Sequence, residues 1–166
     1  MNKPDARSLN SSTQDYLRQQ AIPHTQRMSV NYLASISNQG KVRFMLYTQE
    51  LTAQVFVTFL ERLIARRERK LMWIVDRHPV RRSDAVHQWL QEHRDKIETH
   101  LLPPYAPQLN PAEYLNCDFK QGVYPKHPTR NLAQLKERLR SHLFKLQKLP
   151  TRIIKYFQHP FIAYAA

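Results

Sequence analysis

The stretch LMWIVD, residues 71–76, decides the fold class of this chain. Five apolar residues run without a break and end in an acid. A short apolar run of this kind is typical of a parallel strand that is buried on both faces. The segment therefore predicts an α/β protein, because parallel strands are joined by crossover helices. Open α/β sheets place their chemistry at the carboxyl ends of strands, so Asp76 is the first candidate functional residue.

The sequence on either side supplies the other elements of such a fold. MSVNYLASIS (28–37) and KVRFMLYTQ (41–49), joined by the turn NQG, predict a β-hairpin. Thr52 is placed to cap a helix over 52–70. The later predicted elements are a helix over 83–92, a strand over 97–103, a helix from about 111, a leucine-striped basic helix over 129–149 and a short helix at 152–158. The order ββαβαβαα predicts a mixed sheet with helices packed on it.

The N-terminal segment differs from the rest. Residues 1–27 are rich in Ser, Asn, Gln and Asp and carry no periodic apolar pattern, so they predict a flexible tail. Residues 28–166 then form one domain, and a chain of 166 residues is a normal length for one.

The charge balance points to a polyanionic partner. The chain has 26 Lys and Arg against 13 Asp and Glu, a net charge of +13, and a pI near 10.2. Nucleic acid is the first candidate for such a protein, and a solvated basic surface, a ribosomal role and a membrane-surface role are the alternatives. The single cysteine, no apolar run near the ~20 residues of a membrane span, and no apolar leader at the N-terminus together predict a cytoplasmic location.

A second acid, Glu113, stands out in LPPYAPQLNPAEYLNCDFK (102–120). Its four prolines fix φ and disfavour helix in the residues just before them. The path from strand to helix is therefore stiff, and we expect it to pre-position Glu113 in the first helical turn. Asp76 and Glu113 both follow strands, and two carboxylates at one sheet edge could hold Mg²⁺ against a phosphodiester. The alternative for Glu113 is a favourable partner of the helix dipole.

These stretches resemble a known family. LPPYAPQLNPAEYLNCDFK resembles the third-acid signature of DDE transposases of the mariner-related bacterial insertion-sequence group, and KLMWIVDRHPVRRSDAVHQWLQEH resembles their second-acid region. VNYLASISNQGKVRFMLYTQELTAQVFVTFLERL resembles the hairpin and helix that come before. The resemblance implies an RNase H-like fold and Mg²⁺-dependent DNA cleavage and strand transfer, with Mn²⁺ as a substitute metal. It makes Asp76 the second and Glu113 the third of three acids that hold two metal ions.

Two departures from the family pattern bear on activity. The family usually has a histidine five residues after the second acid, where this chain has Arg81, and His78 lies in a different register. The strand that carries the first acid is not recognisable ahead of the hairpin, and neither Asp5 nor Asp15 follows an apolar run. We therefore expect an N-terminally truncated domain that lacks its first central strand.

The missing strand leaves three alternatives open. Residues 1–27 supply an unsuspected strand, the hairpin pairs directly with the Asp76 strand, or the isolated chain folds poorly. An open strand edge also invites pairing with another chain, so a dimer or a separately encoded N-terminal half is an expected partner besides transposon-end DNA.

Other polar residues have simpler expected roles. Five basic residues flank the two acids and are candidates to contact DNA phosphates, with solvated surface as the alternative: Arg77, Arg81, Arg82, Lys120 and Lys126. Asp118 is expected at a cap or in solvent, and Cys117 packed on its helix. His87, His93 and His100 lack zinc-site spacing, and no glycine-rich phosphate loop is present.

The expected function is that of a transposase-derived DDE domain with little or no activity as this chain, associated with DNA in a bacterial cytoplasm. The alternatives are a non-catalytic DNA-binding remnant that regulates transposition, and a fragment without function.

Overall fold

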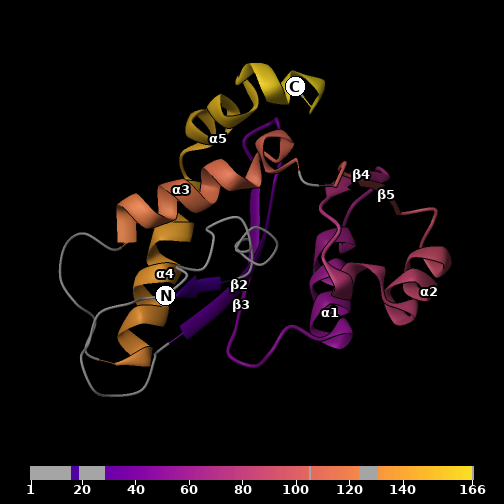
Figure 1. Cartoon of the computed structure of the whole chain (residues 1–166), viewed down its shortest axis with the longest axis horizontal. Helices are drawn as coiled ribbons and strands as arrows, with labels where there is room; N and C mark the ends of the chain where they lie inside the picture. The colour runs from indigo at the N-terminus through magenta and orange to yellow at the C-terminus, as the bar shows by residue number, and fades with distance from the viewer. Residues whose placement is uncertain (1–15, 19–28, 105, 124–130, 166) are drawn as a thin grey trace, which may run out of the picture. The chain divides into compact units, whose positions relative to one another are not determined.

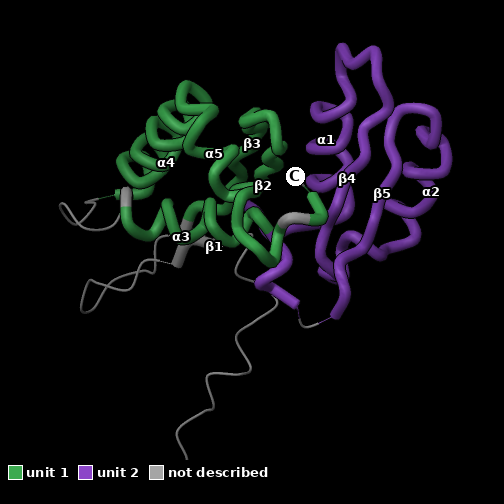
Figure 2. Tube along the Cα trace, turned by 90° about the horizontal axis from the view of Figure 1, so that it is seen from above, with its two compact units in different colours: residues 1–48, 111–166 green, residues 49–110 purple. Residues whose placement is uncertain are grey.

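The structure is a computed structural model, and it describes residues 16–18, 29–104, 106–123 and 131–165. Its chain divides into two compact units, residues 1–48 with 111–166 and residues 49–110 (Figure 2). The predicted boundary between a tail (1–27) and a domain (28–166) stays a prediction, because most of the tail lies outside the described residues.

The first unit is built on a three-stranded antiparallel sheet (Figure 1). The predicted hairpin is confirmed as β2 (Ser29–Ile36) and β3 (Val42–Tyr47), which pair from Asn31 with Tyr47 to Ile36 with Val42. A short strand that the sequence did not predict, β1 (Tyr16–Arg18), pairs with the start of β2. Residues 1–27 therefore do contain a strand, and among the described strands it pairs with β2. That it replaces the missing central strand beside the Asp76 strand stays a prediction.

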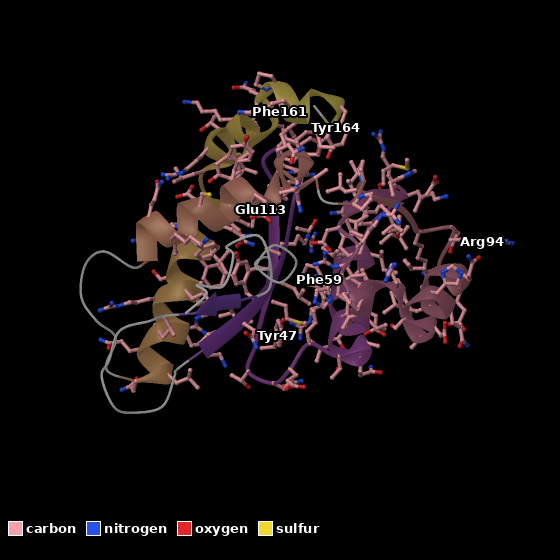
Figure 3. The ribbon with its side chains drawn as sticks, in the orientation of Figure 1. Tyr47, Phe59, Arg94, Glu113, Phe161 and Tyr164 are labelled. Carbon is pink, nitrogen blue, oxygen red and sulfur yellow. The ribbon has the colours of Figure 1, made fainter. Side chains whose placement is uncertain are left out.

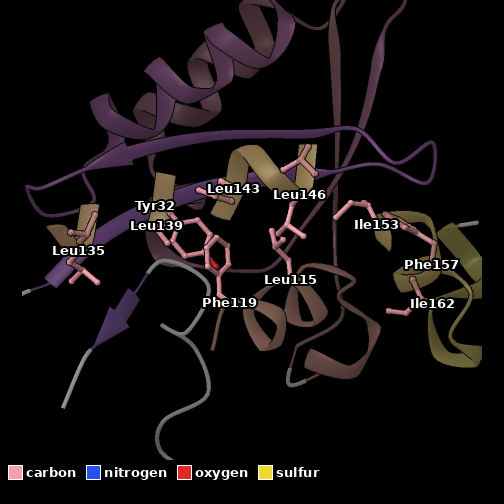
Figure 4. Close-up of a cluster of buried hydrophobic side chains, with 12 residues drawn as sticks. Tyr32, Leu115, Phe119, Leu135, Leu139, Leu143, Leu146, Ile153, Phe157 and Ile162 are labelled. Carbon is pink, nitrogen blue, oxygen red and sulfur yellow. The ribbon is translucent and has the colours of Figure 1, made fainter. Parts of the chain in front are cut away.

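Three helices and a terminal 3-10 turn complete the first unit. They are α3 (Ala112–Val123), α4 (Leu132–Gln147), α5 (Pro150–Phe157) and η4 (Pro160–Ala165). Four leucines of the predicted α4 stripe are fully buried, whereas Leu132 at its start is 38% exposed. Figure 4 shows these leucines meeting Tyr32 of β2, Phe119 of α3 and Ile153 of α5 in one apolar cluster. The burial of this stripe fixes α4 on the sheet.

The hairpin turn depends on a glycine. Gly40 has a φ of +80°, a conformation that glycine adopts at no steric cost, and its amide donates to the carbonyl of Ser37 at 2.9 Å. A Cβ built on Gly40 would lie 2.6 Å from the backbone oxygen of Pro150, the first residue of α5. The turn therefore needs glycine both for its conformation and for the close approach of α5.

The second unit contains the β–α–β arrangement predicted from LMWIVD. The strands β4 (Leu71–Val75) and β5 (Ile97–Leu101) pair in parallel, joined through η2 (Pro79–Arg82) and α2 (Asp84–Glu92). The helix α1 (Ala53–Ile64) precedes them, and its predicted cap is confirmed, since the Thr52 hydroxyl accepts from the Val55 amide at 3.3 Å. A last 3-10 turn, η3 (Pro107–Leu109), lies in the proline-rich stretch.

The expectation that β4 is buried on both faces is only half correct. Trp73 stacks on Phe56 of α1 with ring centroids 5.6 Å apart, and Val75 is buried. Met72 and Ile74 alternate to the opposite face and are exposed. The run is apolar throughout, so its composition could not show which face lacks a cover.

Candidate nuclease site

Asp76 follows directly after β4, where the parallel pair β4–β5 ends. Its Oδ1 accepts a hydrogen bond from the His78 amide at 2.9 Å and forms an ion pair with the Arg81 guanidinium. The Asp76 side chain is 27% exposed, whereas the Arg81 side chain is only 8% exposed. The Asp76 carboxylate is thus already paired with a largely buried cation from its own unit.

The turn after Asp76 is held by local hydrogen bonds. The His78 Nδ1 accepts from the Val80 amide at 3.3 Å, and the Arg81 amide donates to the His78 carbonyl at 2.9 Å. Burial, and next the Arg81 guanidinium, lower the pKa of His78 below its usual range, while Asp76 opposes this in part. A neutral imidazole whose Nδ1 accepts a hydrogen bond agrees with that direction.

Glu113 lies in the first turn of α3 (Figure 3), as predicted, and is partly buried. The Asn116 side-chain amide donates to its Oε2 at 3.4 Å, and the Tyr32 hydroxyl in turn donates to Asn116 Oδ1. Asn116 is one of the few buried polar side chains, so it fixes a polar connection from β2 to Glu113. Sequence reasoning missed Asn116, although its i+3 spacing from Glu113 places both on one helix face.

Asp76 and Glu113 belong to different units, residues 49–110 and residues 1–48 with 111–166. Whether each carboxylate suits a metal ion is therefore judged from the residues around it in its own unit. Glu113 fits, because it is a partly buried carboxylate in the first turn of α3, and carboxylate oxygens are ligands that Mg²⁺ prefers. Asp76 does not fit as it stands, because the Arg81 charge already neutralises the carboxylate on which a metal would depend.

The five predicted DNA-contacting residues have different surroundings. Arg82 and Lys120 are exposed, and Lys126 lies outside the described residues. The Arg77 Nε donates to the Leu102 carbonyl at 3.0 Å and so ties the ends of β4 and β5 together. Arg81 is the ion-pair partner of Asp76.

Two expectations for α3 are wrong. Asp118 is buried instead of solvated, and it contacts Arg152 and Tyr156 of α5. Cys117 is exposed instead of packed. The buried face of α3 runs through Leu115, Asn116, Asp118 and Phe119, which places Cys117 on the opposite side.

The expectation that no zinc site is present concerns three histidines. His87 and His100 are exposed, and His93 follows α2 and stacks on Trp89 with ring centroids 4.0 Å apart. Within the described part of the chain, no three His, Cys, Asp or Glu side chains gather closely enough to hold a metal ion.

In the same residues, no helix is both long and apolar enough to span a bilayer.

Comparison with known proteins identifies the family. A family model described as DDE superfamily endonuclease matches residues 8–136, more than three quarters of the chain, and this range includes both candidate acids. The chain therefore belongs to the DDE superfamily endonucleases. No curated protein sequence matches it.

Solved structures agree on the fold. The catalytic domain of Mos1 mariner transposase matches with a TM-score of 0.59 at 13% identity, over 91% of this chain and 79% of that one. The same domain solved with raltegravir and Mg matches with a TM-score of 0.59 at 13% identity, over 82% and 75%. A Mos1 paired-end complex with the left transposon end matches with a TM-score of 0.58 at 15% identity, over 84% of this chain and 46% of that one. The predicted RNase H-like α/β fold agrees with these structures, and the predicted DDE family is confirmed by the family model.

Proposed function

We propose that this chain is a DNA-binding DDE domain of a transposase that has little or no cleavage activity as this chain. The binding half of the proposal is supported by charge and the cleavage half by the surroundings of Asp76. A Mos1 structure that matches the fold is a complex with a transposon end, which makes such DNA the expected ligand.

One observation carries the binding half: residues 138–166 contain six Lys and Arg and no Asp or Glu. The three lysines among them are exposed, on or next to the helices of the first unit: Lys145, Lys148 and Lys155. Exposed cations without neighbouring acids attract phosphates and release condensed counterions on binding. Lys120 of α3 and Arg82 of the second unit add exposed cations close in sequence to the two acids.

The proposal of little or no cleavage concerns the metal-dependent chemistry of DDE endonucleases. When bound, divalent ions would activate the attacking oxygen and stabilise the leaving oxygen of a phosphodiester. Glu113 is suited to hold such an ion, with Asn116 and Tyr32 fixing its carboxylate. Asp76, by contrast, is already paired with the Arg81 guanidinium. Mg²⁺, or Mn²⁺ in its place, is the cofactor that we expect of any residual activity.

Fluorescence anisotropy with a labelled DNA duplex tests the binding half. We expect binding that weakens by roughly 100-fold between 50 and 200 mM salt if about four phosphates are contacted. Glu113→Gln and added EDTA should leave the affinity unchanged, because the proposed contacts are basic side chains. Binding that needs both metal and Glu113 would contradict this half.

Supercoiled plasmid incubated with Mn²⁺ tests the cleavage half. We expect wild type and Glu113→Ala to leave the plasmid equally intact. Nicking by wild type that disappears in Glu113→Ala would establish the second candidate function, an active nuclease, which the position of Glu113 at the start of α3 favours.

A further inference from the structure

We infer that Asp76 serves in this chain as the counter-ion of the buried Arg81, and that Arg81 keeps metal from this carboxylate. The inference deepens the proposed function, since it rests on the assignment of Asp76 as the family's second acid. It does not depend on DNA binding, and its tests use no DNA.

The Arg81 side chain is largely buried. The Arg81 side chain is 8% exposed, and its guanidinium lies 5.5 Å from the centroid of the Phe56 ring on α1. A guanidinium stays charged at every physiological pH, so a buried one needs a negative partner. Asp76 supplies that charge through the described ion pair.

The backbone between Asp76 and Arg81 forms a hydrogen-bonded turn that places Arg81 beside Asp76. Asp76 Oδ1 accepts the His78 amide, and Pro79 then begins the 3-10 turn η2. The Arg81 amide closes that turn on the His78 carbonyl. Because the turn fixes the Arg81 backbone and Phe56 covers its side chain, the ion pair is part of the packed structure of the second unit.

A metal ion would have to compete with Arg81 for the Asp76 carboxylate. One oxygen, Asp76 Oδ1, accepts both the His78 amide and the Arg81 guanidinium. A metal ion that binds this oxygen must displace the largely buried Arg81 guanidinium from it. Mg²⁺ gives up its water reluctantly, which makes that exchange unfavourable. A histidine at position 81 could be neutral and would not impose this competition.

Thermal unfolding tests the structural half. We expect Asp76→Asn to lower the Tm by roughly 5–10 °C, because it removes the carboxylate charge that pairs with a largely buried guanidinium. Asp95→Asn, the same chemical change at an exposed site of the same unit, should have no effect. Adding Arg81→Met to Asp76→Asn should restore much of the lost Tm, since Met fills the space on Phe56 without a charge. An unchanged or raised Tm in Asp76→Asn would overturn the inference.

Mn²⁺ binding, measured as the free-ion EPR signal without DNA, tests the metal half. Wild type and Asp76→Asn should bind Mn²⁺ equally weakly. Arg81→His should bind more tightly, on the order of tenfold, and Asp76→Asn in that background should remove the gain. Arg94→Met, at an exposed arginine of the same unit, is the control and should match wild type. Asp76-dependent binding in wild type, or no gain in folded Arg81→His, would overturn this half.

Discussion

Asp118 lies on α3 with its carboxylate turned into the protein, although the sequence predicted a cap or solvent position. Its oxygens accept from Arg152 Nε and Nη2 at 2.6 and 2.5 Å and from the Tyr156 hydroxyl, and His142 Nε2 lies 3.9 Å away. Burial, and then the hydrogen bond to Asp118, raise the pKa of Tyr156, so its hydroxyl stays protonated and donates. One carboxylate thus joins α3 to α4 and α5.

Asp118→Asn should therefore destabilise the first unit. Breaking a fully buried pair costs about 3–5 kcal/mol, but Arg152 is 53% exposed and water recovers part of its charge, so we expect a loss of about 2 kcal/mol. Urea denaturation followed by circular dichroism measures it. The control is Glu137→Gln, which breaks the exposed Arg140–Glu137 pair at 2.9 Å and should cost less than about 0.5 kcal/mol. Equal losses in both variants would contradict the role of Asp118.

His142 makes stability depend on pH. Burial is the largest influence and lowers its pKa below the usual 6.5, nearby Arg152 and Lys145 act in the same direction, and Asp118 opposes them. Between the two pKa values the unfolded chain binds more protons than the folded one, so stability rises with pH. This contribution is complete above about pH 7.5 and is lost as the pH falls through 6.5 towards the lower folded value.

We therefore expect the urea midpoint of wild type to fall as the pH is lowered from about 7.5 to about 5.5. His142→Gln cannot titrate, so its midpoint should fall less over the same range. Parallel pH profiles of the two proteins, or a wild-type midpoint that rises on acidification, would show that His142 is not responsible.

The elements that the sequence predicted correctly are those that local chemistry determines. Thr52 caps α1, the NQG turn joins β2 to β3, and four leucines at helical spacing bury one face of α4. Each of these signals lies within one element or one turn. The strand β1 was missed because YLR has no strand-like alternation, and only its pairing with β2 makes it a strand.

Gly40→Ala should show how strongly the hairpin turn depends on its one glycine. An alanine at a φ of +80° is strained, and its Cβ would meet the Pro150 backbone at 2.6 Å, so we expect a loss of about 1–3 kcal/mol. Urea denaturation measures this loss. Gln39→Ala, at the exposed neighbouring turn position, should stay within about 0.5 kcal/mol of wild type. A Gly40→Ala protein as stable as Gln39→Ala would mean that α5 moves away at no cost.

For the molecule as a whole, the sequence predicted both candidate acids but not what engages them. Asp76 and Glu113 were placed by strand ends and by the proline-rich stretch, and both lie where expected, after β4 and at the start of α3. Their partners were not predictable in the same way. Phe56 reaches Arg81 from 25 positions earlier in the chain, and Tyr32 reaches Asn116 across 84 positions. Such contacts follow from tertiary packing, which a one-dimensional pattern does not contain.

The distribution of charge over the whole chain gives the last prediction. The net charge of +13 is spread unevenly, because residues 138–166 hold six cations and no acid, while residues 49–110 hold eight of the 13 acids. If the exposed lysines of the acid-free segment contact phosphates, each one releases close to one counterion. Lys145→Gln, Lys148→Gln and Lys155→Gln should then each reduce the slope of log K against log salt by about 0.9.

Anisotropy titrations of a DNA duplex at four or more salt concentrations measure these slopes. Lys70→Gln is the matched control, because Lys70 is also exposed but is paired with Glu98 at 2.9 Å, so its removal should leave the slope unchanged. The three variants should lose affinity equally for different duplex sequences, since phosphate contacts carry no sequence information. Slopes that stay at the wild-type value in all three variants would place the DNA contacts elsewhere on the chain.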